Sequence, residues 1–154
     1  MAFSVRIQQE DFSVDHEFMK IEGESSSSGA VVFFVGLVRD FYEAKDKSKK
    51  VFGIELEHYP DMTESAIFEI IEEAKKRYGI ESARVVHRIG TLYAGDKIVL
   101  VACASSHREA AFQAAQYIMD FLKTKVPIWK KEIGDDGEQW LGVKDKDKRA
   151  AQQW

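Results

Sequence analysis

The chain has 154 residues, of which 45% are hydrophobic and 31% are charged, and its formal net charge is −4. This length and balance predict a single folded domain over residues 1–154 with a substantial hydrophobic core. The net negative charge argues against a general binder of polyanions, so a site for an anion requires a local cluster of cations.

Cysteine and histidine usage excludes two kinds of site. Cys103 is the only cysteine, which rules out an internal disulfide, and its apolar neighbours "IVLVACAS" predict a small buried hydrophobe rather than a catalytic thiol. The histidines His16, His58 and His87 lack the spacing of metal ligands. We therefore expect no metal and no cofactor. No apolar signal run opens the chain, which predicts a cytoplasmic protein.

The N-terminal part predicts a strand, a helix and a second strand. Residues 3–8 alternate loosely between apolar and polar side chains, as a strand does. Residues 13–22 fit a short helix with Ser13 as its N-cap. Residues 30–38, "AVVFFVGLV", form an almost unbroken apolar run, which predicts a strand buried on both faces.

The clearest helix covers residues 60–79. Its isoleucines recur at spacings of three and four, so they lie on one face. Asp61 and Glu64 have the spacing of a capping box at its start. A strand at 52–59 precedes this helix, after a polar and charged loop at 40–50.

Two more strands and a second long helix follow. Residues 82–90 and 96–104 are rich in β-branched side chains and predict strands. Ser106 and Glu109 match the S-x-x-E capping box, which predicts a helix start there. Pro127 cannot continue a helix, so this helix should end a few residues earlier.

The C-terminal residues predict a hairpin and a tail. Residues 128–143 resemble a β-hairpin around "GDDG", and a charged tail that ends in Trp154 follows it. Strands and helices follow one another in mixed order rather than in strict βαβ alternation. The sequence therefore predicts an α+β fold with mostly antiparallel sheets and two main amphipathic helices.

Two positively charged positions are candidates for binding an anion. His107 and Arg108 fall in the first turn of a predicted helix, where backbone N–H groups and the helix dipole already favour a negative ligand. Alternatively, Arg108 is solvated and His107 packs against the preceding strand. Arg39 ends a predicted buried strand, where ligands often bind, but a solvated arginine is the simpler interpretation of that pattern.

The stretch "FLKTKVPIWKKEI", residues 121–133, mixes lysines with apolar side chains. If the chain reverses at Pro127, Lys123 and Lys130 can converge on one place. A lysine near other cations and apolar walls has a lowered pKa and can act as a nucleophile or a base. The alternative is structural, because lysines favour helix C-termini and protect edge strands. On the residues alone both interpretations remain open.

Four stretches, taken in order from about Gly29 to Trp154, resemble the molybdopterin synthase catalytic (large) subunit family. They are "GAVVFFVGLVRD", "LEHYPDMTE", "VVHRIGTLYAGDKIVLVACASSHREAAFQAAQYIMDFLKTKVPIWKKE" and the closing "W". The resemblance implies an α/β-hammerhead-like fold. It also implies conversion of cyclic pyranopterin monophosphate into molybdopterin, a step of molybdenum cofactor biosynthesis. Its sulfur donor would be the C-terminal thiocarboxylate of a small ubiquitin-like carrier subunit ending in Gly-Gly. The implied assembly is a homodimer within a heterotetramer.

The resemblance also assigns site residues. It implies that Lys123 and Lys130 are the catalytic lysines. The substrate-binding residues that it implies are Leu37, Val38, Arg39, His107, Arg108, Lys131 and Glu132. Many relatives carry lysine at the position of Leu37, so only a backbone contact can remain there. The loop at 40–50 differs from the relatives and carries no assignment.

Two alternatives belong to other functional classes. The lysines between Lys123 and Lys131, together with Trp129, could bind single-stranded RNA, although the net charge of −4 argues against this. A hydrolase of phosphate esters could instead use His107 and Arg108 without any partner protein. The resemblance favours the synthase over both.

Overall fold

The structure is a computed structural model that describes residues 2–24, 26–39, 51–134, 137–142 and 145–154. It contains two four-stranded sheets. The first sheet contains, in spatial order, β1 (Phe3–Gln8), β4 (Ser82–Arg88), β6 (Lys97–Ser105) and β2 (Ala30–Leu37). The second contains β5 (Gly90–Tyr93), β3 (Val51–His58), β7 (Ile128–Gly134) and β8 (Gly137–Leu141).

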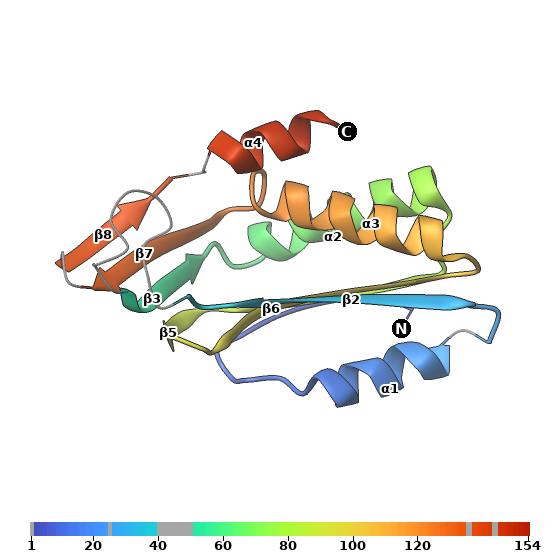
Figure 1. Ribbon diagram of the computed structural model, residues 1–154, viewed down its shortest axis with the longest axis horizontal. Coiled ribbons are helices and arrows are strands. Elements are labelled where there is room, and N and C mark those ends of the chain that lie inside the picture. The colour runs from blue at the N-terminus through green and yellow to red at the C-terminus, as the bar shows by residue number, and fades with distance from the viewer. Residues whose placement is uncertain (1, 25, 40–50, 135–136, 143–144) are drawn as a thin grey trace.

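Helices cover both faces of the first sheet (Figure 1). One face carries α2 (Met62–Tyr78) and α3 (Arg108–Leu122), and the other carries α1 (Val14–Glu24). The last helix, α4 (Asp145–Gln152), lies beside α3. Among the described strands only β1 and β4 pair in parallel, and the other ladders are antiparallel. The predicted α+β class, with its two main amphipathic helices, is confirmed.

The first sheet separates two hydrophobic clusters. On the side of α2 and α3, the fully buried Ile67, Ile71 and Ile118 pack against strands β4 and β6. On the side of α1, Phe12 and Ile21 pack against the opposite face of the same strands. Burial of apolar area contributes about 25 cal/mol per Å², so these two layers supply most of the driving force for folding.

Strand β2 corrects one prediction. Its apolar run indicated burial on both faces, but β2 is the last strand in the order of its sheet and pairs only with β6 among the described strands. Consequently Phe34 is 41% exposed and Leu37 is 55% exposed. The prediction failed because an apolar run indicates a strand but does not say how completely other elements cover its two faces.

One further prediction, about the start of α3, was wrong. Ser106 and Glu109 do not form the expected capping box: His107 is the N-cap of α3, and no side chain caps it. The Ser106 hydroxyl instead donates to the Glu81 carboxylate at 2.8 Å. The charged tail, for which the sequence analysis predicted no secondary structure, contains α4, a helix with no buried residue.

Other local predictions were confirmed. The Ser13 hydroxyl accepts the N–H of His16 at 3.2 Å, as an N-cap should. At the start of α2, the Glu64 carboxylate accepts the N–H of Asp61 at 2.9 Å. Strands β7 and β8 form the predicted hairpin. The expected loop at 40–50 lies outside the described residues. None of the described helices combines the length and the apolar character that crossing a membrane requires.

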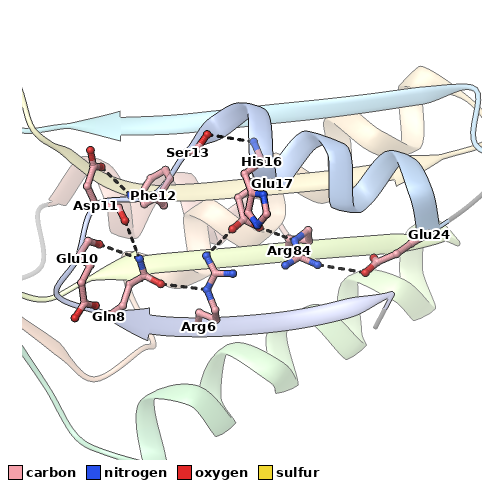
Figure 2. A network of polar contacts seen from close by, with 10 residues as sticks. All are labelled: Arg6, Gln8, Glu10, Asp11, Phe12, Ser13, His16, Glu17, Glu24 and Arg84. Carbon is pink, nitrogen blue, oxygen red and sulfur yellow. Dashed lines mark hydrogen bonds and ion pairs between the residues drawn. The ribbon is translucent and has the colours of Figure 1, made fainter.

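Buried ion pairs join α1 to the first sheet (Figure 2). Glu17, which is 1% exposed, accepts from Arg84 at 2.8 Å and from Arg6. Arg84 also donates to Glu24 at 3.3 Å. Burial raises the pKa of Glu17, but the hydrogen bonds and charges of Arg84 and Arg6 outweigh burial and hold that pKa below its usual value.

The C-terminal residue is anchored to the helical layer. The indole N–H of Trp154 donates to the buried carboxylate of Asp120 at 2.6 Å. The ring packs edge-on against Tyr78 and Tyr117, with centroids 6.0 and 5.7 Å away. The carbonyl of Trp154 accepts from Arg77 at 3.1 Å.

We expect Trp154→Ala to lower the free energy of unfolding by about 2 kcal/mol, because it removes the aromatic contacts and one hydrogen bond to a buried carboxylate. Urea denaturation followed by circular dichroism measures this loss. Gln152→Ala, at an exposed position of the same segment, is the control and should stay within about 0.5 kcal/mol of the wild type. Equal stabilities of the two variants would contradict the anchoring role of Trp154.

Candidate active site

A cavity of about 750 Å³ lies where the two sheets meet. Its walls come from the end of β2, from β3, β4 and β6, from the C-terminal end of α3, from β7 and from α4. The apolar part of the wall includes Ile54, Leu56, Val99, Met119 and Leu122. Its volume falls in the range of small-molecule sites, and its apolar lining with a few polar groups is typical of them.

Lys123 and Lys130 both line this cavity. Lys123 is the C-cap of α3, and its N–H donates to the carbonyl of Met119 at 3.1 Å. Past it the chain reverses, and the carbonyl of Pro127 accepts from the Thr63 hydroxyl of α2 at 2.9 Å. Strand β7 then runs antiparallel to β3, which returns Lys130 to the cavity. The structure therefore brings together the two lysines that the sequence placed on either side of Pro127.

Alternation along β7 separates its charged side chains. Lys130 and Glu132 line the cavity, and the Lys130 Nζ and Glu132 Oε1 atoms are 4.0 Å apart. Lys131, between them, is not a lining residue, and its Nζ pairs with Glu55 at 3.1 Å. The cavity thus receives a cation and an anion from β7, and Lys131 contributes to the ion pairing between β7 and β3.

The residues at the end of β2 form another part of the wall. Leu37, Val38 and Arg39 all line the cavity. Val38 is buried, and its backbone is held by hydrogen bonds of 2.9 Å to Gly95 and to Asp96. Arg39 follows directly and lines the same cavity as Lys123 and Lys130.

His107 and Arg108 lie elsewhere. They sit at the N-terminal end of α3, whereas Lys123 caps its C-terminal end. The helix has 15 residues and rises about 1.5 Å per residue, so its two ends are about 22 Å apart. Neither residue lines the cavity. Within one chain the structure does not bring the helix-start cations together with the two lysines.

His87 is a cavity residue that sequence reasoning missed as a site residue. It lies on β4, is 6% exposed, and its Nδ1 atom is 2.7 Å from the carbonyl oxygen of Arg88. Burial, with smaller effects from the charges of Lys123 and His58, lowers the pKa of His87 to about 4 despite the bond to Arg88. The imidazole is therefore neutral at physiological pH. Local sequence gives no signal for this position, because it depends on how the two sheets meet.

The arrangement suits an anion with an apolar or planar body. Lysine and arginine side chains supply positive charge against a wall that is largely apolar. Cys103 is fully buried, and burial raises the pKa of its thiol to about 12, so it is not a nucleophile. Among the residues that the structure describes, no group of three or more His, Cys, Asp or Glu side chains could hold a metal ion.

Comparison with known proteins gives a consistent result. Residues 7–125 match the family model described as MoaE protein. The molybdopterin synthase catalytic subunit of Vibrio cholerae serotype O1 is 46% identical over 154 residues, which cover 100% of this chain and 99% of that protein.

Two solved structures share the fold. The molybdopterin biosynthesis MoaE protein from Burkholderia ambifaria superposes with a TM-score of 0.83 at 41% identity, covering 100% of this chain and 98% of that one. Molybdopterin synthase from Staphylococcus aureus gives a TM-score of 0.78 at 34% identity, covering 89% and 96%. With this extent of identity, and with two cationic side chains from separate elements on one cavity, the chain belongs to the MoaE family of molybdopterin synthase catalytic subunits.

Proposed function

We propose that this chain converts cyclic pyranopterin monophosphate into molybdopterin in the cavity between its two sheets. The sulfur comes from the C-terminal thiocarboxylate of a small carrier subunit, and the chain works as a single cytoplasmic domain in a homodimer within a heterotetramer. The observation that carries the proposal is the meeting of Lys123, Lys130 and Arg39, far apart in sequence, on one cavity.

We assign the lysines distinct roles in this reaction. Lys123, at the end of α3, faces the thiocarboxylate carbonyl and transfers a proton or makes a transient covalent contact. Lys130, on β7, stabilises the negative charge that develops as sulfur adds and one ester bond of the cyclic phosphate breaks, leaving the phosphate on the product as a monoester. Glu132 beside it limits the repulsion between the cations.

All but one of the remaining predicted residues bind the substrate in this proposal, the exception being Lys131. Arg39 holds the phosphate, and Leu37 offers a backbone contact at the end of β2. Val38, whose own backbone groups are bonded to Gly95 and Asp96, offers apolar surface. Lys131 acts from outside the wall by holding β7 against β3 through Glu55. Because α3 separates His107 and Arg108 from Lys123 by about 22 Å, we assign these two residues to the cavity of the second copy in the homodimer.

The decisive experiment mixes the purified chain with cyclic pyranopterin monophosphate and a thiocarboxylated carrier protein, and measures molybdopterin formation. The control is the same carrier with an ordinary C-terminal carboxylate, which has no sulfur to give. Product that requires the thiocarboxylate supports the proposal. Release of phosphate without any carrier would indicate a hydrolase instead, and no product with a verified carrier would contradict the synthase.

A further inference from the structure

The chain reversal between α3 and β7 decides where Lys123 and Lys130 lie, because it joins the two elements that carry these lysines. Most hydrogen bonds of residues 124–127 have both partners within this turn or in the two ends that flank it, so they shape the turn but do not fix its place in the fold. Among the residues that the structure describes, the exception joins the Pro127 carbonyl to the hydroxyl of Thr63, in the first turn of α2, at 2.9 Å.

The hydroxyl of Thr63 makes two hydrogen bonds in a fully buried position. Thr63 is 0% exposed. Its hydroxyl oxygen accepts the N–H of Tyr59, directly after β3, at 3.0 Å, and its single proton is donated to the Pro127 carbonyl. The N–H of Thr63 donates in turn to the Tyr59 carbonyl at 2.9 Å. One buried hydroxyl therefore links the end of β3, the start of α2 and the chain reversal.

This bridge stands where the ladder between β3 and β7 ends. The last pair of that antiparallel ladder places His58 opposite Ile128. In the same register the next pair is Tyr59 opposite Pro127. The Thr63 hydroxyl lies between the N–H of the first and the carbonyl of the second. It therefore keeps these two backbone groups further apart than a direct hydrogen bond of about 2.9 Å, at the point where the chain enters β7.

We propose that Thr63 is a positioning residue for Lys123 and Lys130: its hydroxyl fixes the reversal between α3 and β7 and so sets where the two ammonium groups lie on the cavity. This inference rests on the proposed function of the lysines. Thr63 does not line the cavity, whereas Pro127 does, so Thr63 acts from behind the wall. A displacement of about 1 Å in a reacting group can cost about 100-fold in rate, which makes one such bond important for turnover.

Two substitutions separate the hydroxyl from the space that the side chain fills. Thr63→Val has a similar shape but no bridge, so the N–H of Tyr59 and the carbonyl of Pro127 pair directly only if the reversal moves toward β3. We expect this variant to lower kcat by about 10–100-fold. The KM for the pterin should change little, because Arg39, which holds the phosphate, follows β2 and does not depend on this bond.

Thr63→Ser keeps the hydroxyl and loses only a methyl group, so its kcat should stay within about threefold of the wild type. A side chain that only fills space predicts the reverse order, with Val faster than Ser. That order, or a loss below tenfold in Thr63→Val, would overturn the proposal. If Thr63→Val does not fold, Thr63→Ser carries the test alone, and a loss greater than about threefold in its kcat overturns the proposal.

Thr124→Val is the matched control. The Thr124 hydroxyl also donates to a backbone carbonyl, that of Asp120 at 3.0 Å, but this bond stays within the end of α3. Its removal should lower kcat less than about threefold. Equal losses in Thr124→Val and Thr63→Val would show that the rate responds to any loosening of this region, and would count against a specific role of Thr63.

A second measurement needs neither carrier nor substrate. The carbonyl ¹³C resonance of Pro127 reports the bond from the hydroxyl, and the ¹³Cε resonances of Lys123 and Lys130 report the surroundings of the two lysines. We expect all three to move in Thr63→Val and to stay in Thr63→Ser, while Lys75, on the same helix as Thr63, stays in both. Lysine resonances that do not move in Thr63→Val overturn the proposal even if synthase activity is verified. Moved resonances in a protein that makes no product would leave the positioning standing and refute the synthase reaction.

Discussion

Replacement of Lys123 by alanine is expected to lower the rate of molybdopterin formation by at least about 100-fold, the usual loss when one group that stabilises a transition state is removed. Lys123 caps α3 at the edge of the cavity, so alanine removes the ammonium group without breaking the helix. The measurement is the single-turnover rate with thiocarboxylated carrier and saturating pterin. A single-turnover rate does not include the step of product release.

Lys125→Ala is the matched control for this variant. Lys125 lies two positions further on, is exposed, and stacks its ammonium over Phe121, 4.6 Å from the ring centroid. It carries the same charge but does not line the cavity, so its loss should change the rate less than about threefold. Near-native turnover by Lys123→Ala, or equal losses in the two variants, would refute the assignment of Lys123.

Replacement of Glu17 by alanine is expected to lower the free energy of unfolding by about 3–5 kcal/mol, the loss found when one partner of a buried ion pair is removed. Glu17 is 1% exposed and bonds both Arg6 and Arg84 (Figure 2). Arg84 is itself 5% exposed, so the variant leaves a buried guanidinium with only Glu24 as a carboxylate partner among the described residues. Urea denaturation at pH 7 measures the change.

The difference in unfolding free energy between the wild type and Glu17→Ala should depend on pH. Because the pKa of Glu17 is lower in the folded chain than its usual value of 4.5, its contribution to stability is complete above that pH and is lost as the pH falls through the folded pKa. The gap between the wild type and Glu17→Ala should therefore narrow below about pH 4.5.

The control for Glu17→Ala is Glu22→Ala, at an exposed position of the same helix. It removes the same charge from α1 without touching the arginines, and should cost less than about 0.5 kcal/mol. A loss below about 1 kcal/mol in Glu17→Ala would show that α1 is held by its apolar contacts alone.

The parts of the fold that sequence reasoning predicted correctly are those set by local chemistry. The isoleucine spacing in α2 and the bond from Asp61 to Glu64 both lie within one element, so the sequence alone reveals them. The exposure of Phe34 and Leu37 on β2 depends on which distant elements cover the faces of that strand. The hydroxyl of Ser106 prefers Glu81, a distant residue that no local motif includes.

The candidate site divides in the same way. The break at Pro127 suggested that Lys123 and Lys130 converge, and both line the cavity. The distance between His107 and Lys123 follows from the length of α3, which the sequence predicted. The resemblance, however, assigned both residues to the same substrate and so did not suggest that they lie apart. His87 was missed because the cavity that it lines is built from β4, β3 and the end of α3, which no single stretch of sequence contains.

The cavity can form only late in the synthesis of the chain, because its walls come from residues far apart in the sequence. Its walls are contributed by residues from Phe34 to Asp147, a span of about three quarters of the polypeptide. At about 5–20 residues per second, synthesis of that span takes roughly 6–23 s. Strands β2 and β3 emerge early and wait for β7, their wall partner on the far side of α3. During that interval the apolar surfaces that later line the cavity are not yet covered by β7. We therefore expect the nascent chain to bind chaperones before it can act as an enzyme.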